Sequence, residues 1–275
     1  MPRISGWTPV SNARSTPEVG AARFALKGTI DTGMKEASDV AALPGGRFIV
    51  VGDRSNAAVL VDGKGKKAAL DLPGLKDGKS QLEGVAYDPN RHHLFVAREE
   101  ARELVRYEWD ALDKKASAVE EKRFDLPLDG PRNKGVEGLS YVPGEVSPTG
   151  QPQLLLAREG KPRELLMLGD GGKGKPLPVK LEKEVYSACH DFSALAVDPK
   201  TGHLFISSDE SATVVQVKLV RDGDKLIGKM VQAFPLRDEQ GKPMARVEGL
   251  AFNERGDLFV LTENNGRLHQ LERQR

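Results

Sequence analysis

Residues 82–97 read LEGVAYDPNRHHLFVA, two short apolar runs joined by a turn that contains Asp88, Pro89 and Asn90. Proline presets φ in a turn and asparagine tolerates φ > 0, so this stretch predicts a β-hairpin. Its first run has four counterparts: SDVAAL (38–43), VEGLSY (136–141), FSALAV (192–197) and VEGLAF (247–252). The second residues of the five runs are Asp39, Glu83, Glu137, Ser193 and Glu248, at steps of 44, 54, 56 and 55 residues. The chain is therefore a repeat protein with a period typical of propeller blades.

Each copy continues through turns into further apolar runs. The second runs are 48–51, 94–97, 154–157, 204–207 and 258–261, and the third runs are 58–61, 104–107, 165–168, 214–217 and 268–271. Fourth runs close four of the copies, at 68–72, 123–126, 178–181 and 230–234. Four short strands per repeat, without a convincing helix, predict an all-β fold: a five-bladed β-propeller with four-stranded antiparallel blades. Six blades are the alternative, although the sequence contains no recognisable sixth copy.

The last copy has three strands and ends at Leu271, whereas residues 21–30 form an unmatched strand before the first copy. We expect this N-terminal strand to pair with the last blade, because closing the ring removes a free sheet edge. A closed ring predicts a monomer. Residues 21–275 then form a single propeller domain, and residues 1–20, which are polar and contain Pro2, Pro9 and Pro17, form a flexible N-terminal arm.

Composition excludes several classes of protein. The 275 residues carry 41 Lys and Arg against 40 Asp and Glu, an interleaved balance that argues against nucleic-acid binding. One cysteine, Cys189, permits neither an intramolecular disulfide nor a Cys-rich zinc site. We find no apolar stretch long enough for a membrane span and no signal sequence, so we expect a cytoplasmic protein as the sequence stands, or a periplasmic or secreted one if a signal peptide has been removed.

Carboxylates dominate the repeated column. The first strand of a propeller blade lies innermost, so residues at its start face the central channel or its mouth. Asp39, Glu83, Glu137 and Glu248 fill four of the five positions, and Asp191 stands two residues ahead of the serine in the fifth. Converging carboxylates repel one another, and calcium, which accepts six to eight oxygen ligands, would compensate them. We therefore expect these residues to hold a divalent cation, Ca²⁺, although magnesium or a water network would serve less specifically.

A structural interpretation of the same column remains open: Glu-Gly is also a tight strand entry in which glutamate caps backbone N–H groups. A second acidic column lies at the ends of the second runs and contains Asp53, Glu99, Glu159, Asp209 and Glu263. Antiparallel strands bring both columns to one face of the disc. We favour a structural role for the second column, because Arg98 and Arg158 sit beside two of its members.

No catalytic residue can be named from the sequence. Cys189, His190 and Asp191 are consecutive, and neighbours in an extended chain point to opposite sides, so they cannot form a nucleophile–base pair. We expect Cys189 to be a structural thiol.

The repeated motif Glu-Gly-[Val/Leu]-[Ala/Ser]-[Tyr/Phe], followed by Asp-Pro, a turn and Leu-Phe-[Val/Ile], resembles the SdiA-regulated family of bacterial calcium-binding β-propellers. The resemblance is strongest over residues 191–210 (DFSALAVDPKTGHLFISSDE) and spans about residues 35–271. Esterase-like phytase, NHL-repeat and gluconolactonase-like propellers share similar blades. The resemblance implies a calcium site on the acidic face, with Glu83, Glu137 and Glu248 at the matching positions and Asp39 and Asp191 matching less closely. Ser193 departs from the pattern.

Three functions are compatible with these residues. The first, which we favour, is a calcium-stabilised propeller without assured catalytic activity that binds a small molecule or a protein on its acidic face. The second is a metal-dependent hydrolase of lactones, esters or phosphoesters, with a channel carboxylate or His190 as base. The third is a metal-free scaffold for protein interactions.

Overall fold

A computed structural model describes residues 21–53, 58–75, 81–110, 119–126, 128, 135–158, 163–169 and 176–274. The predicted N-terminal arm (1–20) and Glu159 lie outside the described residues. The regular secondary structure of the described residues is almost entirely β-strand, which confirms the all-β prediction.

Each repeat folds where its apolar runs predict strands. One four-stranded antiparallel sheet contains β2 (Ala37–Leu43), β3 (Arg47–Gly52), β4 (Ala58–Asp62) and β5 (Lys67–Leu70). A second contains β6 (Leu82–Asp88), β7 (His93–Arg98), β8 (Glu103–Glu108) and β9 (Val119–Asp125). A third contains β18 (Val247–Phe252), β19 (Leu258–Thr262), β20 (Arg267–Arg273) and β1 (Phe24–Asp31).

The remaining strands form one eight-stranded sheet. Its first half is β10 (Val136–Val142), β11 (Gln153–Arg158), β12 (Glu164–Leu168) and β13 (Leu177–Leu181). Its second half is β14 (Ala194–Val197), β15 (Leu204–Ser208), β16 (Thr213–Asp222) and β17 (Lys225–Pro235). The halves are joined by parallel pairing of β13 with β17, from Val179↔Leu226 to Leu181↔Gly228, a link that the sequence repeats did not predict. A short helix, α2 (Lys183–Ala188), was not expected either.

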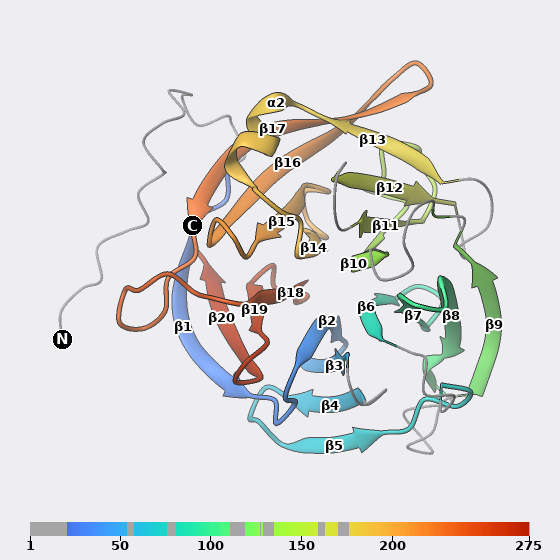
Figure 1. The fold of residues 1–275 in the computed structure, drawn as a ribbon, viewed down its shortest axis with the longest axis vertical. Coiled ribbons are helices and arrows are strands. Elements are labelled where there is room, and N and C mark those ends of the chain that lie inside the picture. The colour runs from blue at the N-terminus through green and yellow to red at the C-terminus, as the bar shows by residue number, and fades with distance from the viewer. Residues whose placement is uncertain are drawn as a thin grey trace.

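The sheets surround a common centre, with β2, β6, β10, β14 and β18 innermost, which is the architecture of a β-propeller (Figure 1). Buried apolar side chains gather between successive sheets: one cluster, for example, joins Ile49 and Val51 of β3 to Val96 of β7. Similar clusters occupy the remaining junctions, including the one between the two halves of the eight-stranded sheet. Packing between the sheets therefore holds the disc together. The longest helix in the described residues is too short to cross a membrane.

The N-terminal strand closes the ring, as predicted. β1 pairs with β20 from Phe24↔Arg273 to Asp31↔Arg267, so the first and last strands share one sheet (Figure 1). Phe24 is 2% exposed and contacts the rings of Phe205, Phe234 and Phe252. The closing strand is thus anchored in the junction with the neighbouring sheet.

We predict that Phe24→Ala lowers the free energy of unfolding by about 3–5 kcal/mol, because it empties a packed aromatic junction. Lys27→Ala on the same strand removes only an exposed ion pair with Glu272 and should change stability by about 0.5 kcal/mol or less. Urea unfolding of both variants provides the measurement. Equal effects would show that β1 pairing, and not the Phe24 junction, secures the ring.

Candidate functional site: the acidic end of the central channel

The innermost strands β6, β10 and β18 begin with β-bulges. The register shifts between Leu82 and Gly84, between Val136 and Gly138, and between Val247 and Gly249. The extra residues at these bulges are Glu83, Glu137 and Glu248. A bulge redirects the side chain of its extra residue, which is why bulges often lie beside functional sites. The repeated glutamates are therefore placed by the same local device in each of these three sheets.

Asp39 does not belong to this glutamate column. In β2 the shift lies between Ala37 and Asp39, so Ser38 is the bulged residue and Asp39 takes the position of Gly84 in β6. The alignment of Asp39 with Glu83 is thus wrong by one residue, because apolar spacing does not reveal which residue is extra. Ser38 and Ser193 occupy the glutamate position in their sheets, and Ser38 is a sequence position whose role the repeat alignment missed.

The Asp39 carboxylate ties three sheets together at the centre. Asp39 is completely buried; its Oδ1 accepts the N–H of Val40 (2.8 Å), and its Oδ2 accepts the N–H groups of Val85 (2.8 Å) and Leu139 (3.4 Å). Burial raises the pKa of Asp39 well above its usual range, and the three N–H groups oppose that rise. Both oxygens are already hydrogen-bonded, so Asp39 acts first as an internal link between sheets.

The second acidic column also links neighbouring sheets. Glu99 Oε1 accepts the N–H of Gly135 (2.7 Å), and Asp209 Oδ1 accepts the N–H of Val247 (3.2 Å) and that of Arg246. Glu263 forms an ion pair with Arg246. These contacts agree with the structural role that we favoured for this column. Arg98 forms an ion pair with Glu103 (2.6 Å), and Arg158 forms one with Glu164 (2.8 Å).

Asp191 caps a turn. Its carboxylate accepts the Ser208 hydroxyl and the N–H groups of Asp209 (3.2 Å) and Glu210 (3.2 Å). The adjacent His190 is exposed, and Cys189 is buried, with a pKa raised to about 12 chiefly by burial. Such a thiol is protonated at neutral pH and a poor nucleophile, as expected of a structural cysteine.

Glu83 and Glu248 are half-buried carboxyls with raised pKa values. Burial first, and then the charges of Asp53 and Glu99, raise the pKa of Glu83 to about 8. Burial and the charges of Asp209 and Glu263 likewise raise the pKa of Glu248 to about 8.

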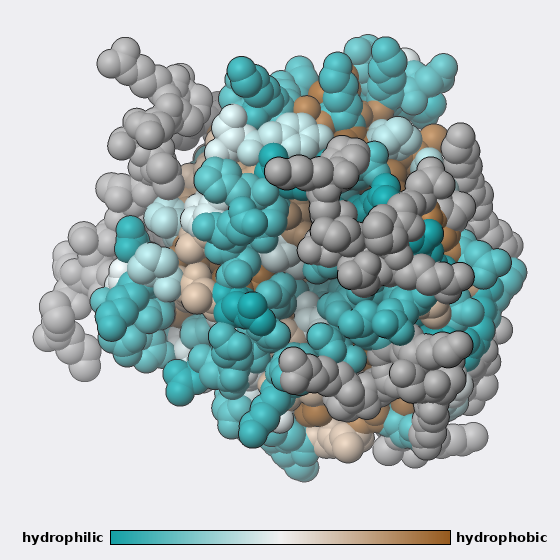
Figure 2. Space-filling model, viewed as in Figure 1, coloured by the Kyte–Doolittle hydropathy of each residue, from teal (hydrophilic) through white to brown (hydrophobic). Residues whose placement is uncertain are grey.

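Both acidic columns therefore meet at one end of the channel, as predicted from the antiparallel strands. The pKa of each of these two glutamates is raised by the second-column carboxylate of its own sheet and by that of the preceding sheet. The face in view in Figure 2 is largely hydrophilic where it is coloured. Within the described ranges, no three His, Cys, Asp or Glu side chains are grouped closely enough to hold a metal as they stand. The channel mouth therefore contains two carboxyls, those of Glu83 and Glu248, that are protonated near neutral pH.

Comparison with known proteins agrees with this propeller. A sequence model of the SdiA-regulated family matches residues 77–267, more than half of the chain, so the protein belongs to that family. The solved structures that it resembles share the fold at low sequence identity. A PQQ-bound aldose sugar dehydrogenase from Streptomyces coelicolor has a TM-score of 0.61 at 14% identity, covering 92% of this chain and 99% of that one.

Two further structures extend the comparison. The Malassezia sympodialis allergen Mala s 1 has a TM-score of 0.57 at 14% identity, over 90% of this chain and 97% of that one. A Bacteroides thetaiotaomicron protein of unknown function has a TM-score of 0.58 at 10% identity, over 87% of this chain and 60% of that one. These likenesses establish the fold and leave function to the residues.

We predict that Asp39→Ala destabilises the protein by about 2–4 kcal/mol, because it leaves buried N–H groups of three strands without their acceptor. Asp62→Ala is the matched control, since Asp62 also accepts two backbone N–H groups, but in an exposed turn. Chemical denaturation of both variants tests this link. A loss for Asp39→Ala no larger than for Asp62→Ala would contradict the central role of this carboxylate.

The raised pKa values predict that stability falls as pH rises. Between the unfolded pKa of 4.5 and the folded pKa of about 8, Glu83 and Glu248 stay protonated in the folded protein while the unfolded chain ionises. The folded state then binds more protons, so the free energy of unfolding declines across this window, by at most about 1.4 kcal/mol per pH unit per group. Denaturant titrations from pH 5 to 8 in EDTA measure the slope. Glu83→Gln/Glu248→Gln should flatten it, and an unchanged slope would contradict the assignment.

Proposed function

We propose that this protein is a calcium-binding propeller whose acidic channel mouth, centred on Glu83, Glu137 and Glu248, binds a divalent cation and through it a further ligand. The observation that carries the proposal is the raised pKa of Glu83 and Glu248, each about 8. Burial first, and then neighbouring carboxylates, make these carboxyls hold protons at neutral pH, and a bound cation supplies positive charge in place of the protons.

The donor chemistry fits calcium better than zinc or copper. The available ligands are carboxylate oxygens, and the described mouth residues include neither a cysteine nor a buried histidine. Asp39 and Asp191, expected as ligands from the sequence, already accept backbone N–H groups and serve better as supports. With no preformed group of three ligands among the described residues, the ion would retain several waters and require the glutamate side chains to turn toward it.

A second function, a metal-dependent hydrolase, draws on the same two glutamates. A carboxyl whose pKa lies near 8 is protonated at neutral pH and can protonate a leaving group, while an ionised neighbour activates water. Assays with lactone, ester and phosphoester substrates in the presence of calcium test this function. Turnover that disappears in Glu83→Gln but persists in Glu145→Gln would favour the enzyme.

We also infer that the ring has five blades. Each half of the eight-stranded sheet repeats the four-stranded antiparallel order of the other sheets, and an apolar cluster separates the two halves as it separates complete sheets. The parallel contact of β13 with β17 then links the outer strands of two adjacent blades.

We predict that calcium raises the melting temperature relative to EDTA, and that calorimetric titration at pH 7 in two buffers of different ionisation enthalpy detects proton release. Binding to the folded state alone must stabilise it, by about 2.7 kcal/mol at a calcium concentration of one hundred times Kd. Glu83→Gln/Glu248→Gln should abolish both effects.

The control is Glu145→Gln, the same type of substitution at one exposed position in the turn between β10 and β11, at the opposite end of the channel. It should leave calcium binding unchanged. If millimolar calcium alters neither the melting temperature nor the heat of titration, the carboxyls form a hydrogen-bonded rim and the proposal fails.

A further inference from the structure

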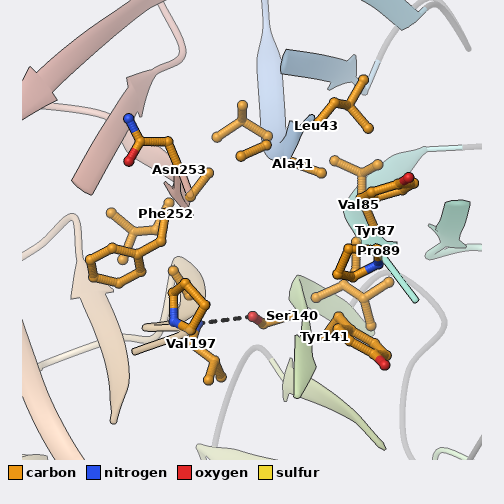
Figure 3. A pocket seen from close by; sticks show the side chains of 18 of the residues that line it. Ala41, Leu43, Val85, Tyr87, Pro89, Ser140, Tyr141, Val197, Phe252 and Asn253 are labelled. Carbon is orange, nitrogen blue, oxygen red and sulfur yellow. Dashed lines mark hydrogen bonds between the residues drawn. The ribbon is translucent and has the colours of Figure 1, made fainter. Parts of the chain in front are cut away.

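The opposite end of the channel contains a pit of about 170 Å³. The ends of all the innermost strands line it, together with Pro44, Pro89, Pro143 and Pro199 of the turns that follow. Figure 3 shows the side chains of Tyr87, Tyr141 and Phe252 spread around an open centre. The pit is separate from the acidic mouth, because the innermost strands run from one end of the channel to the other.

The small size of certain side chains creates this space. At one level the structurally equivalent positions hold Ala41, Ala86, Ser140, Ala196 and Ala251. At the next level, four strands have a larger side chain: Tyr87, Tyr141, Val197 and Phe252. The equivalent residue of β2 is Ala42. Ala42 is therefore the smallest residue at this level of the wall, where it packs against the apolar cluster that contains Val40 and Phe48.

The wall carries hydrogen-bonding groups although its side chains are largely apolar. Only one edge of each innermost strand is paired, and alternate residues of an edge strand turn their N–H and C=O groups away from the partner strand. The N–H groups of Val40, Val85 and Leu139, which reach the central Asp39, fix this direction. By the same alternation, Ala42, Tyr141 and Phe252 present both donors and acceptors to the pit.

One contact within the pit shows which chemical group suits this wall. The Ser140 hydroxyl accepts the N–H of Val197 at 3.1 Å, so a hydroxyl from one innermost strand, β10, satisfies an inward N–H of the next, β14 (Figure 3). The charge of the lining residues argues against an anionic ligand. Of the described residues that line the pit, Glu254 alone is charged, and no Lys or Arg is present to bind an anion.

We propose that the pit binds a neutral, hydroxyl-bearing ring molecule of monosaccharide size. Hydroxyl groups donate and accept, as the backbone of an edge strand requires, and the carbon faces of the ring match the proline and aromatic rim. A volume of about 170 Å³ leaves room for several waters, whose hydrogen bonds to the wall the hydroxyls of such a molecule would replace.

The test uses D-glucose and myo-inositol as neutral probes, with gluconate and glucosamine as charged analogues, in saturation-transfer NMR and calorimetry on the full chain. We expect at least one neutral probe to bind, at least about tenfold more tightly than the charged compounds, a difference of about 1.4 kcal/mol. Trp109, whose ring lies 6.2 Å from that of Tyr87, should report binding by a change in fluorescence.

Ala42→Phe is the blocking variant. Phe252 occupies the equivalent position in β18, and an unchanged melting temperature verifies that Ala42→Phe folds. Binding of the neutral probes should be lost in Ala42→Phe and kept in Glu83→Gln, which affects the acidic end only. Failure of both neutral probes, equal binding of the charged analogues, or binding that survives Ala42→Phe would overturn the proposal, whatever the calcium titration shows.

Discussion

The free inner edge of each sheet is the constraint on which the rest of the structure depends. Pairing of β1 with β20 joins the two ends of the chain in one sheet and closes the ring. The innermost strands, however, do not pair with one another. Their inward N–H and C=O groups must be satisfied within the channel. Asp39 and Ser140 do this from within the chain, because each accepts backbone N–H hydrogen bonds from neighbouring innermost strands. Solvent or ligands must serve the groups that remain.

The same constraint divides the channel into two different ends. Where the strands enter, β-bulges place Glu83, Glu137 and Glu248 among the carboxylates that end the second strands, and burial keeps two of them protonated near neutral pH. Where the strands leave, small side chains and prolines surround a pit with almost no charge. The buried Asp39 lies between these ends, so each can have its own ligand chemistry.

The strands were predictable because each is a short apolar run between turn residues, a local pattern that survives divergence of the repeats. Closure by the N-terminal strand was predictable for a similar reason, since the last copy lacked one strand. The position of Asp39 was not, because a bulge adds a residue without changing the apolar pattern, and an alignment by apolar spacing therefore places Asp39 with the glutamates. The β13–β17 pairing and α2 also escaped prediction, because they arise between repeats and not within them.

Carboxylates in such a repeat have one of two roles, structural or ligand-binding, and residue type alone does not distinguish them. One group of carboxylates accepts backbone N–H groups and so joins strands and sheets: Asp39, Glu99, Asp191 and Asp209. Glu83 and Glu248 instead face other acids, and desolvation is the largest influence on them. A carboxyl that is costly to ionise destabilises the fold as pH rises from 4.5 to about 8, so its place at the channel mouth is better explained by a ligand than by the fold. The distinction follows from hydrogen-bond partners, and it separates residues that build the ring from those able to give it a function.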